Sequence, residues 1–225
     1  DDVESRGLGD VYKRQVVGDT RFDRVLQIRE EAKDLPLVEL FKNNTMTFVA
    51  GSSWQPDEDL FIEYFNQHPE VKLIIAPHVI DENHLVEIIR KLKRPYVRYT
   101  RADEKNVRKA DCLIIDCFGL LSSIYRYGEI AYIGGGFGVG IHNTLEAAVY
   151  GIPVIFGPKY QKFQEAVQLL EAKGGFSVKS YEELKALLDR MLEDESFLRE
   201  TGTNAGTYVT GNAGATDKVL GMINF

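Results

Sequence analysis

A glycine-rich segment lies between an apolar run and a helix-like run at residues 133–158, and reads IGGGFGVGIHNTLEAAVYGIPVIFGP. Such loops favour nucleotide phosphates, because backbone without side chains approaches an anion closely and the following helix offers unpaired N–H groups. Two common phosphate loops are excluded by the spacing. The fingerprint G-x-G-x-x-G, started at Gly134 and Gly136, would end on Val139. A P-loop needs Gly-Lys-Ser/Thr, and the segment contains no lysine.

The HNTLEAA motif within this segment contains a carboxylate with two alternative roles. Asn143 is followed three residues later by Glu146, which is the spacing of a helix N-cap with a reciprocal acidic partner. The same carboxylate stands in the first turn of a helix beside the glycine loop. There it could accept both hydroxyls of a ribose while helix N–H groups face a phosphate. Both interpretations remain open at this point.

Polar and unusual residues also follow the earlier strand-like runs. Ser52 and Ser53 precede a predicted helix, so their hydroxyls either bind phosphate oxygens or cap that helix. Trp54, the only tryptophan, either stacks on a base or anchors the core. His78 follows Pro77 at a strand end, where it either contacts a base or sugar or faces solvent.

Short β-rich runs alternate with amphipathic helical runs from residue 45 onward, after a turn and helix predicted within 16–36. We predict strands at 46–51, 71–77, 96–100, 112–116, 129–135, 153–158 and 176–178, and helices at 57–67, 82–92, 120–128, 143–151, 162–175 and 181–194, followed by a helical tail. This order predicts an α/β fold, a Rossmann-like and mostly parallel sheet with helices on both faces. Ligands of such sheets bind outside the carboxyl ends of the strands, where the residues above are found.

The composition narrows the class of protein and of ligand. The 225 residues are 44% hydrophobic, enough for a substantial core. A formal net charge of −7 argues against nucleic-acid binding, which needs a broad basic face. Neither a run of about 18 apolar residues nor a secretory signal is found, so we expect a soluble, cytoplasmic chain.

The cysteines and histidines predict neither a disulfide framework nor a metal site. Cys112 and Cys117 lie in and at the end of an apolar run, where buried thiols are usual. His78 and His84 are too far apart for a helical metal pair, and no cluster of cysteines or carboxylates completes a zinc site. We therefore expect no bound metal and no cofactor.

Five separated motifs carry a resemblance to a known family. They are GDTRFDRV (18–25), GSSW (51–54), APHVIDENHL (76–85), DCFGLLSSIYRYGEIAYIGGGF (116–137) and GIHNTLEAAVYGIPVIFGP (140–158). In this order they resemble the carboxyl-terminal half of 3-deoxy-D-manno-octulosonic acid (Kdo) transferases, most of all the Bacteroidetes branch. The resemblance runs from residue 16 to the end of the chain.

The resemblance implies the carboxyl-terminal domain of a GT-B glycosyltransferase, which binds CMP-Kdo. It further implies an inverting transfer of Kdo to a lipid A precursor, held by an amino-terminal domain at the cytoplasmic face of the inner membrane. The family's general base lies in that other domain, so no catalytic residue is assigned here and the chain alone is expected to be inactive. Residues 1–15 match nothing in the family, and we interpret them as a non-native or disordered leader before a domain at 16–225.

The resemblance also assigns the nucleotide-sugar site residue by residue. Glu146 would accept the ribose hydroxyls, Asn143 and the glycine loop would face the phosphate, and Arg21 would be the fixed cation. The implied site comprises Arg21, Ser52, Ser53, Pro77, His78, Gly119, Gly135, Gly136, Asn143 and Glu146. Two departures weaken the match, since His78 replaces the usual arginine and Leu120 stands where many members have glutamate.

Two other readings remain open at the level of the sequence. A UDP-sugar-dependent GT-B transferase or epimerase would also place a carboxylate on a ribose. A non-catalytic nucleotide-binding α/β module of flavodoxin-like build would instead place an acidic cluster after the first strand, where this chain has GSSW.

Overall fold

The computed structural model describes residues 18–138 and 140–222, and these residues share one seven-stranded parallel sheet. The strand order is β3-β4-β2-β1-β5-β6-β7. The strands are β1 (Thr47–Ser53), β2 (Lys72–Pro77), β3 (Tyr96–Arg98), β4 (Cys112–Ile114), β5 (Ile130–Ile133), β6 (Val154–Phe156) and β7 (Gly175–Ser177). The predicted Rossmann-like sheet is confirmed, and every strand pairing in it is parallel.

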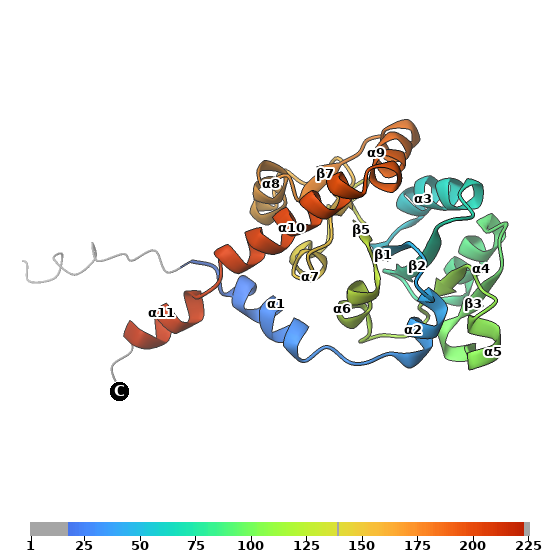
Figure 1. The fold of residues 1–225 in the computed structure, drawn as a ribbon, viewed down its shortest axis with the longest axis horizontal. Coiled ribbons are helices and arrows are strands. Elements are labelled where there is room, and N and C mark those ends of the chain that lie inside the picture. Colours follow the sequence, from blue (N-terminus) through green and yellow to red (C-terminus); the bar gives the residue numbers. More distant parts are fainter. Residues whose placement is uncertain (1–17, 139, 223–225) are drawn as a thin grey trace, which may run out of the picture.

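Helices cover both faces of the sheet (Figure 1). One face packs against α3 (Gln55–Gln67), α4 (Glu82–Lys91) and α9 (Tyr181–Glu193). The other packs against α1 (Thr20–Glu30), α2 (Pro36–Lys42), α5 (Glu104–Val107), α6 (Leu121–Ile124), α7 (Leu145–Ala148), α8 (Gln164–Glu171) and α10 (Glu195–Gly211). Two short 3₁₀ turns, η1 (Tyr99–Arg101) and η2 (Tyr125–Tyr127), and α11 (Ala215–Met222) complete the described chain.

The two-sided core follows from the alternation of side chains along buried strands. In β1, Phe48 and Ala50 join the cluster under α3, α4 and α9, whereas Val49 between them joins the cluster on the opposite face. Successive residues of a strand point to opposite faces, so a central strand covered on both sides must be apolar throughout. This is why the strands were visible in the sequence as continuous apolar runs.

The structure differs from the sequence-based elements mainly on the helices around the site. The helix predicted at 143–151 is the single-turn α7, because Asn143 accepts the backbone N–H of Leu145 and the chain leaves the helix through Gly151 at φ +71°. The helix predicted at 120–128 divides into α6 and η2. The short helices α2 and α5 were not predicted.

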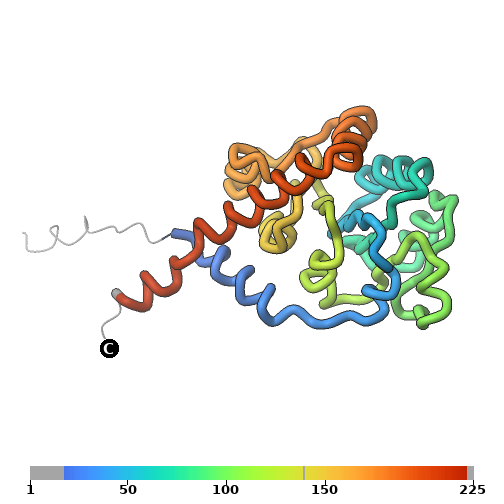
Figure 2. Tube along the Cα trace, viewed as in Figure 1, coloured from blue at the N-terminus to red at the C-terminus, as the bar shows by residue number. Residues whose placement is uncertain are grey.

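The first and last described helices lie side by side. Figure 2 shows α1 next to the red end of the tube, where α11 follows α10. The carboxylate of Asp23 in α1 accepts the backbone N–H groups of Gly214 and Thr216 and the Thr216 hydroxyl, at 2.5 to 2.8 Å. One aspartate thus joins the beginning and the end of the described fold.

Two further sequence-based expectations concern cysteines and membranes. Cys112 and Cys117 are free thiols, and Cys112 is fully buried, as expected from its apolar run. None of the helices in 18–138 and 140–222 combines the length and apolarity that crossing a membrane requires. The predicted leader at 1–15 lies outside the described residues.

Candidate nucleotide-sugar site

A hollow of about 250 Å³ lies at the carboxyl ends of β1, β2 and β4, and we call it the strand-end hollow. Its wall contains four predicted site residues, Ser52, Pro77, His78 and Gly119. The remaining wall is formed by Ala76, Ile80, Ile115, Cys117, Phe118 and Leu121. An apolar hollow with a few polar groups at the ligand-binding edge of a parallel sheet is the usual setting of a small-molecule site.

Ser52 has an unusual backbone at the end of β1. Its φ is +52°, in the left-handed region, and the pairing of β1 with β2 shifts register between Gly51 and Ser53. A Cβ on Gly134 would lie 2.3 Å from the Ser52 carbonyl oxygen, so β1 and β5 end in direct backbone contact here. A left-handed non-glycine residue is uncommon and concentrates at functional sites.

Ser53 does not face the hollow, which corrects the expectation that its hydroxyl meets a phosphate. Its side chain is fully buried and donates to Oε1 of Glu58 at 2.9 Å. The physical reason is the alternation of side chains along β1, since only one of two neighbouring serines can point outward. Ser52 remains the serine of this pair that lines the hollow.

Glu58 is itself part of a buried hydrogen-bonded chain. Its Oε2 atom lies 2.9 Å from Nε2 of His84, whose Nδ1 lies 2.9 Å from the Val79 carbonyl oxygen. Since a carbonyl only accepts, Nδ1 carries a proton, and the Nε2–Oε2 contact needs a second proton. Burial raises the pKa of Glu58, while His84 and Ser53 oppose the rise. Burial alone would lower the pKa of His84, but the bond to Glu58 raises it above its usual value.

The glycine loop is held from below by Asp57. Asp57 is fully buried in the first turn of α3 and accepts the backbone N–H of Gly135 at 2.9 Å, the N–H of Trp54 at 3.0 Å and the Tyr132 hydroxyl at 2.9 Å. Burial raises the pKa of Asp57, and these bonds oppose the rise. The N–H of Gly135 is therefore bound within the protein and does not face a ligand phosphate, contrary to the prediction.

The next glycine serves close packing. A Cβ on Gly136 would lie 2.6 Å from the backbone of Gly157, so the loops after β5 and β6 touch through two glycines. The donor-facing role predicted for Gly136 is replaced in this geometry by backbone contact. Two of the loop's glycines thus position the strand ends rather than cradle an anion.

Three rings are stacked beside the hollow. His78 lies between Trp54 and His142, with ring centroids 4.6 and 4.4 Å apart. The indole N–H of Trp54 donates to Nε2 of His142 at 3.3 Å, so the proton of His142 is on Nδ1. Burial, and then the nearby His78, lowers the pKa of His142. His142 was missed at the sequence level, although it stands directly before Asn143 in the HNTLEAA motif.

Asn143 and Glu146 lie together, in neither of the two sequence-based arrangements in full. The Asn143 side-chain amide donates to Oε1 of Glu146 at 3.0 Å, whereas a capping box would use the backbone N–H. Burial raises the pKa of Glu146, and the bond from Asn143 opposes the rise. A partly buried carboxylate oriented by an amide is suited to accept hydroxyl groups.

Arg21 is engaged by two carboxylates rather than held free for a ligand. Its guanidinium donates to both oxygens of Glu165 in α8 at 2.9 and 3.2 Å and to Asp19 at 2.9 Å. These partners hold the pKa of Arg21 above its usual value. The two negative charges outweigh one positive charge, so the predicted role as a fixed cation for the donor does not fit this geometry.

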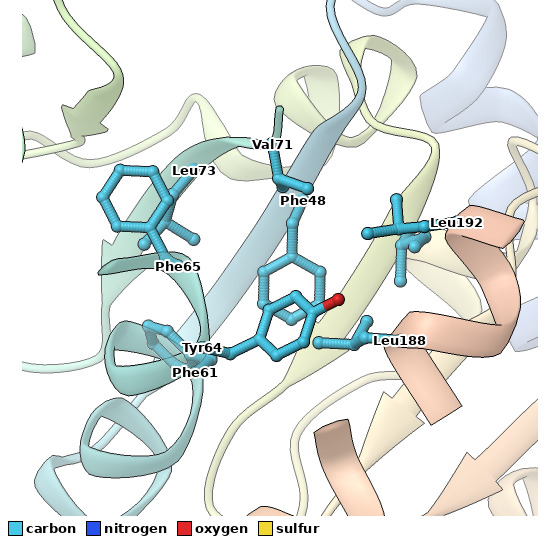
Figure 3. A pocket seen from close by; sticks show the side chains of 9 residues that line it. Phe48, Phe61, Tyr64, Phe65, Val71, Leu73, Leu188 and Leu192 are labelled. Atoms are coloured by element: carbon cyan, nitrogen blue, oxygen red, sulfur yellow. The ribbon is translucent and has the colours of Figure 1, made fainter. Parts of the chain in front are cut away.

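Neither a metal nor the amino ends of the strands offers a competing site in the described chain. The residues 18–138 and 140–222 contain no cluster of three potential metal ligands. A small apolar cavity between α3 and α9 lies at the other end of the sheet, where Phe48, Leu73 and Ile130 begin their strands (Figure 3). Its lining is almost wholly apolar, which indicates a packing defect of the core.

Comparison with known sequences finds relatives of one kind. A 3-deoxy-D-manno-octulosonic acid transferase of Aquifex aeolicus is 34% identical over 150 residues, which cover 64% of this chain and 41% of the relative. Its counterpart in Rickettsia conorii is 25% identical over 217 residues, covering 92% of this chain and 46% of that protein. The chain thus spans less than half the length of these two relatives. No protein-family model matches it.

Comparison with solved structures identifies the fold. The C-terminal CMP-Kdo binding domain of WaaA from Acinetobacter baumannii matches with a TM-score of 0.67 and 18% identity, covering 84% of this chain and 97% of that domain. Anabaena HepE in complex with UDP and glucose matches with a TM-score of 0.61 and 12% identity, covering 85% and 53%.

Fold and strand-end site together define the carboxyl-terminal domain of a GT-B glycosyltransferase. Within that class the chain is related by sequence to the Kdo transferases, and the resemblance predicted from its motifs is confirmed.

Proposed function

We propose that this chain is the donor-binding part of a transferase that moves Kdo from CMP-Kdo to a lipid A precursor. The observation that carries the proposal is the 34% identity over 150 residues to a curated Kdo transferase. The fold likeness to a domain named for CMP-Kdo binding supports it at the level of architecture. The strand-end hollow supplies a site of suitable character at the expected edge of the sheet.

The residues at this edge suggest how the donor is held. The nucleotide occupies the strand-end hollow beside Ser52 and His78, and Glu146 accepts ribose hydroxyls. Transfer is inverting: an acceptor hydroxyl, deprotonated by a base outside the donor site, attacks the anomeric carbon of Kdo while CMP leaves. Hydrogen-bond donors at the strand edge stabilise the departing phosphate, so no metal is required.

The acceptor side of the reaction is inferred from the family alone. The lipid A precursor would be bound by the part of the relatives that this chain does not cover, at the cytoplasmic face of the inner membrane. That part would also supply membrane association and the general base. We therefore assign donor binding, and no transfer by itself, to the 225-residue chain.

Titration calorimetry of the chain with CMP, UMP and UDP, each with and without EDTA, tests the proposal. We expect CMP to bind most tightly and its affinity to survive chelation. Absence of CMP binding would refute the donor assignment, and preference for UDP would favour a UDP-sugar enzyme. Affinity that disappears with EDTA would overturn the metal-free site.

A further inference from the structure

Phe118 leaves an unusually large aromatic surface in water at the rim of the strand-end hollow. It is 81% exposed and lines the hollow with part of its side chain. The other exposed large hydrophobic residues in the described chain are Tyr96 at 44% on the edge strand and Leu220 at 56% on α11, and neither lines the hollow. Exposure of an aromatic ring forgoes the free energy of burial, so a ring at the mouth of a ligand-sized hollow indicates a binding role.

The local backbone presents Phe118 outward. Gly119 adopts φ +81°, a left-handed conformation that turns the chain between β4 and α6, and a Cβ there would meet no atom within 4 Å. Beneath the ring, Ile115 and the half-buried Cys117 continue into the wall of the hollow. The ring therefore stands clear of its own loop while remaining anchored beside the hollow.

The chemistry of the wall selects the kind of occupant. Ala76, Ile80 and Ile115 are apolar, and polar side chains come only from Ser52 and His78. An occupant with flat apolar faces and a polar edge satisfies both parts of this wall, and a nucleobase has that form. Bases stack on aromatic side chains, whichever base is involved, because every base has a π-face.

We propose that Phe118 stacks on the base of the nucleotide donor and closes the strand-end hollow over it. The proposal rests on the proposed function, because the base is that of CMP. It assigns to Phe118 a direct contact with the donor, in a segment where the family resemblance had singled out only Gly119 and Leu120.

Four variants separate stacking from general apolar cover. Phe118→Ala removes the ring, Phe118→Leu keeps apolar volume without a flat face, and Phe118→Trp enlarges the flat face. Tyr96→Ala is the matched control, because it removes an exposed aromatic ring outside the hollow. Stacking on one aromatic side chain predicts a loss of CMP affinity of about five- to hundredfold for Phe118→Ala.

The expected pattern in calorimetry with CMP has four parts. Affinity falls in Phe118→Ala and in Phe118→Leu, is retained in Phe118→Trp, and is unchanged in Tyr96→Ala, while all four proteins keep the parent's melting temperature. Addition of CMP should also quench the new indole fluorescence of Phe118→Trp relative to the parent. Equal affinity in the parent and Phe118→Ala would overturn the stacking contact and leave the donor assignment standing. Parent-like affinity in Phe118→Leu would also overturn it, and failure of the parent to bind CMP would refute both.

Discussion

Glu146 is the residue at which helix structure and ligand binding make different predictions. Its Oε1 atom accepts the Asn143 amide at 3.0 Å, and Glu146→Gln keeps an acceptor at that position. If the carboxylate also accepts two ribose hydroxyls, the amide removes a charge and an acceptor. We expect Glu146→Gln to lose about 1.5–3 kcal/mol of CMP binding, or about tenfold to a hundredfold.

Two measurements support or contradict the ribose contact. The melting temperature of unliganded Glu146→Gln should match the parent, because the Asn143 contact is retained. 2′-Deoxy-CMP should bind the parent more weakly than CMP does. Unchanged CMP affinity in the variant, together with equal affinity of the parent for both nucleotides, would restrict Glu146 to a structural role.

At the residue scale the sequence located the loops of the site but not the direction of each group. Ser52 and Ser53 are neighbours at a strand end, yet one lines the hollow and the other is buried on Glu58. The acceptor for the Gly135 N–H is Asp57, 78 residues away in the sequence. Strand ends follow from local hydrophobic pattern, whereas the pairing of distant polar groups is set by tertiary packing, which a single sequence does not display.

The contact between α3 and α4 makes stability depend on pH. The pKa of His84 in the folded chain lies above its usual value near 6.5, since the bond to Glu58 outweighs the effect of burial. A raised histidine pKa contributes stability that is fully present below about pH 6.5 and is lost as the pH rises through the folded value. We expect the parent to exceed His84→Gln in unfolding free energy by more at pH 6 than at pH 8.

Urea denaturation at the two pH values checks this expectation. The double variant Glu58→Gln/His84→Gln is the control, because it removes both titrating groups and should behave like His84→Gln in its response to pH. If the parent and His84→Gln differ by the same free energy at both pH values, the shared proton between α3 and α4 does not exist.

The cavity between α3 and α9 separates stability from binding. Leu188 of α9 is 2% exposed and faces Phe48 and Tyr64 across this cavity (Figure 3). Leu188→Ala enlarges an existing void, so we expect a loss of about 2–5 kcal/mol of unfolding free energy. CMP affinity should stay unchanged, because the cavity lies at the amino ends of the strands. Lys185→Ala, at an exposed position on the same helix, should change neither quantity appreciably.

The elements themselves were largely predictable where they are long or fully buried. Each of the seven strands was anticipated, because a strand covered on both faces is apolar throughout. The short α2 and α5 were not, since one or two helical turns leave too little periodic pattern to recognise. α7 proved shorter than predicted because Asn143 and Gly151 define its ends through a side-chain bond and a left-handed φ.

The described molecule is held together across its length by contacts of the first helix with later elements. Asp23 binds the segment leading into α11, and Arg21 binds Glu165 in α8, 144 residues further along the chain. Both contacts join α1 to elements formed by the last third of the chain. A residue selected from the sequence as a ligand cation therefore has an alternative role in long-range assembly.

Arg21→Ala and Glu165→Ala distinguish these roles of Arg21. In the observed geometry the guanidinium links α1 to α8, so each variant breaks the same contact and should lower the unfolding free energy similarly. Arg21 is 55% exposed, and solvent screening limits the expected loss to about 1 kcal/mol or less. CMP affinity should remain that of the parent in both. If instead Arg21 were the donor's cation, Arg21→Ala alone would weaken CMP binding, and Glu165→Ala would strengthen it by releasing the guanidinium, so opposite shifts in the two calorimetric titrations would contradict the structural role.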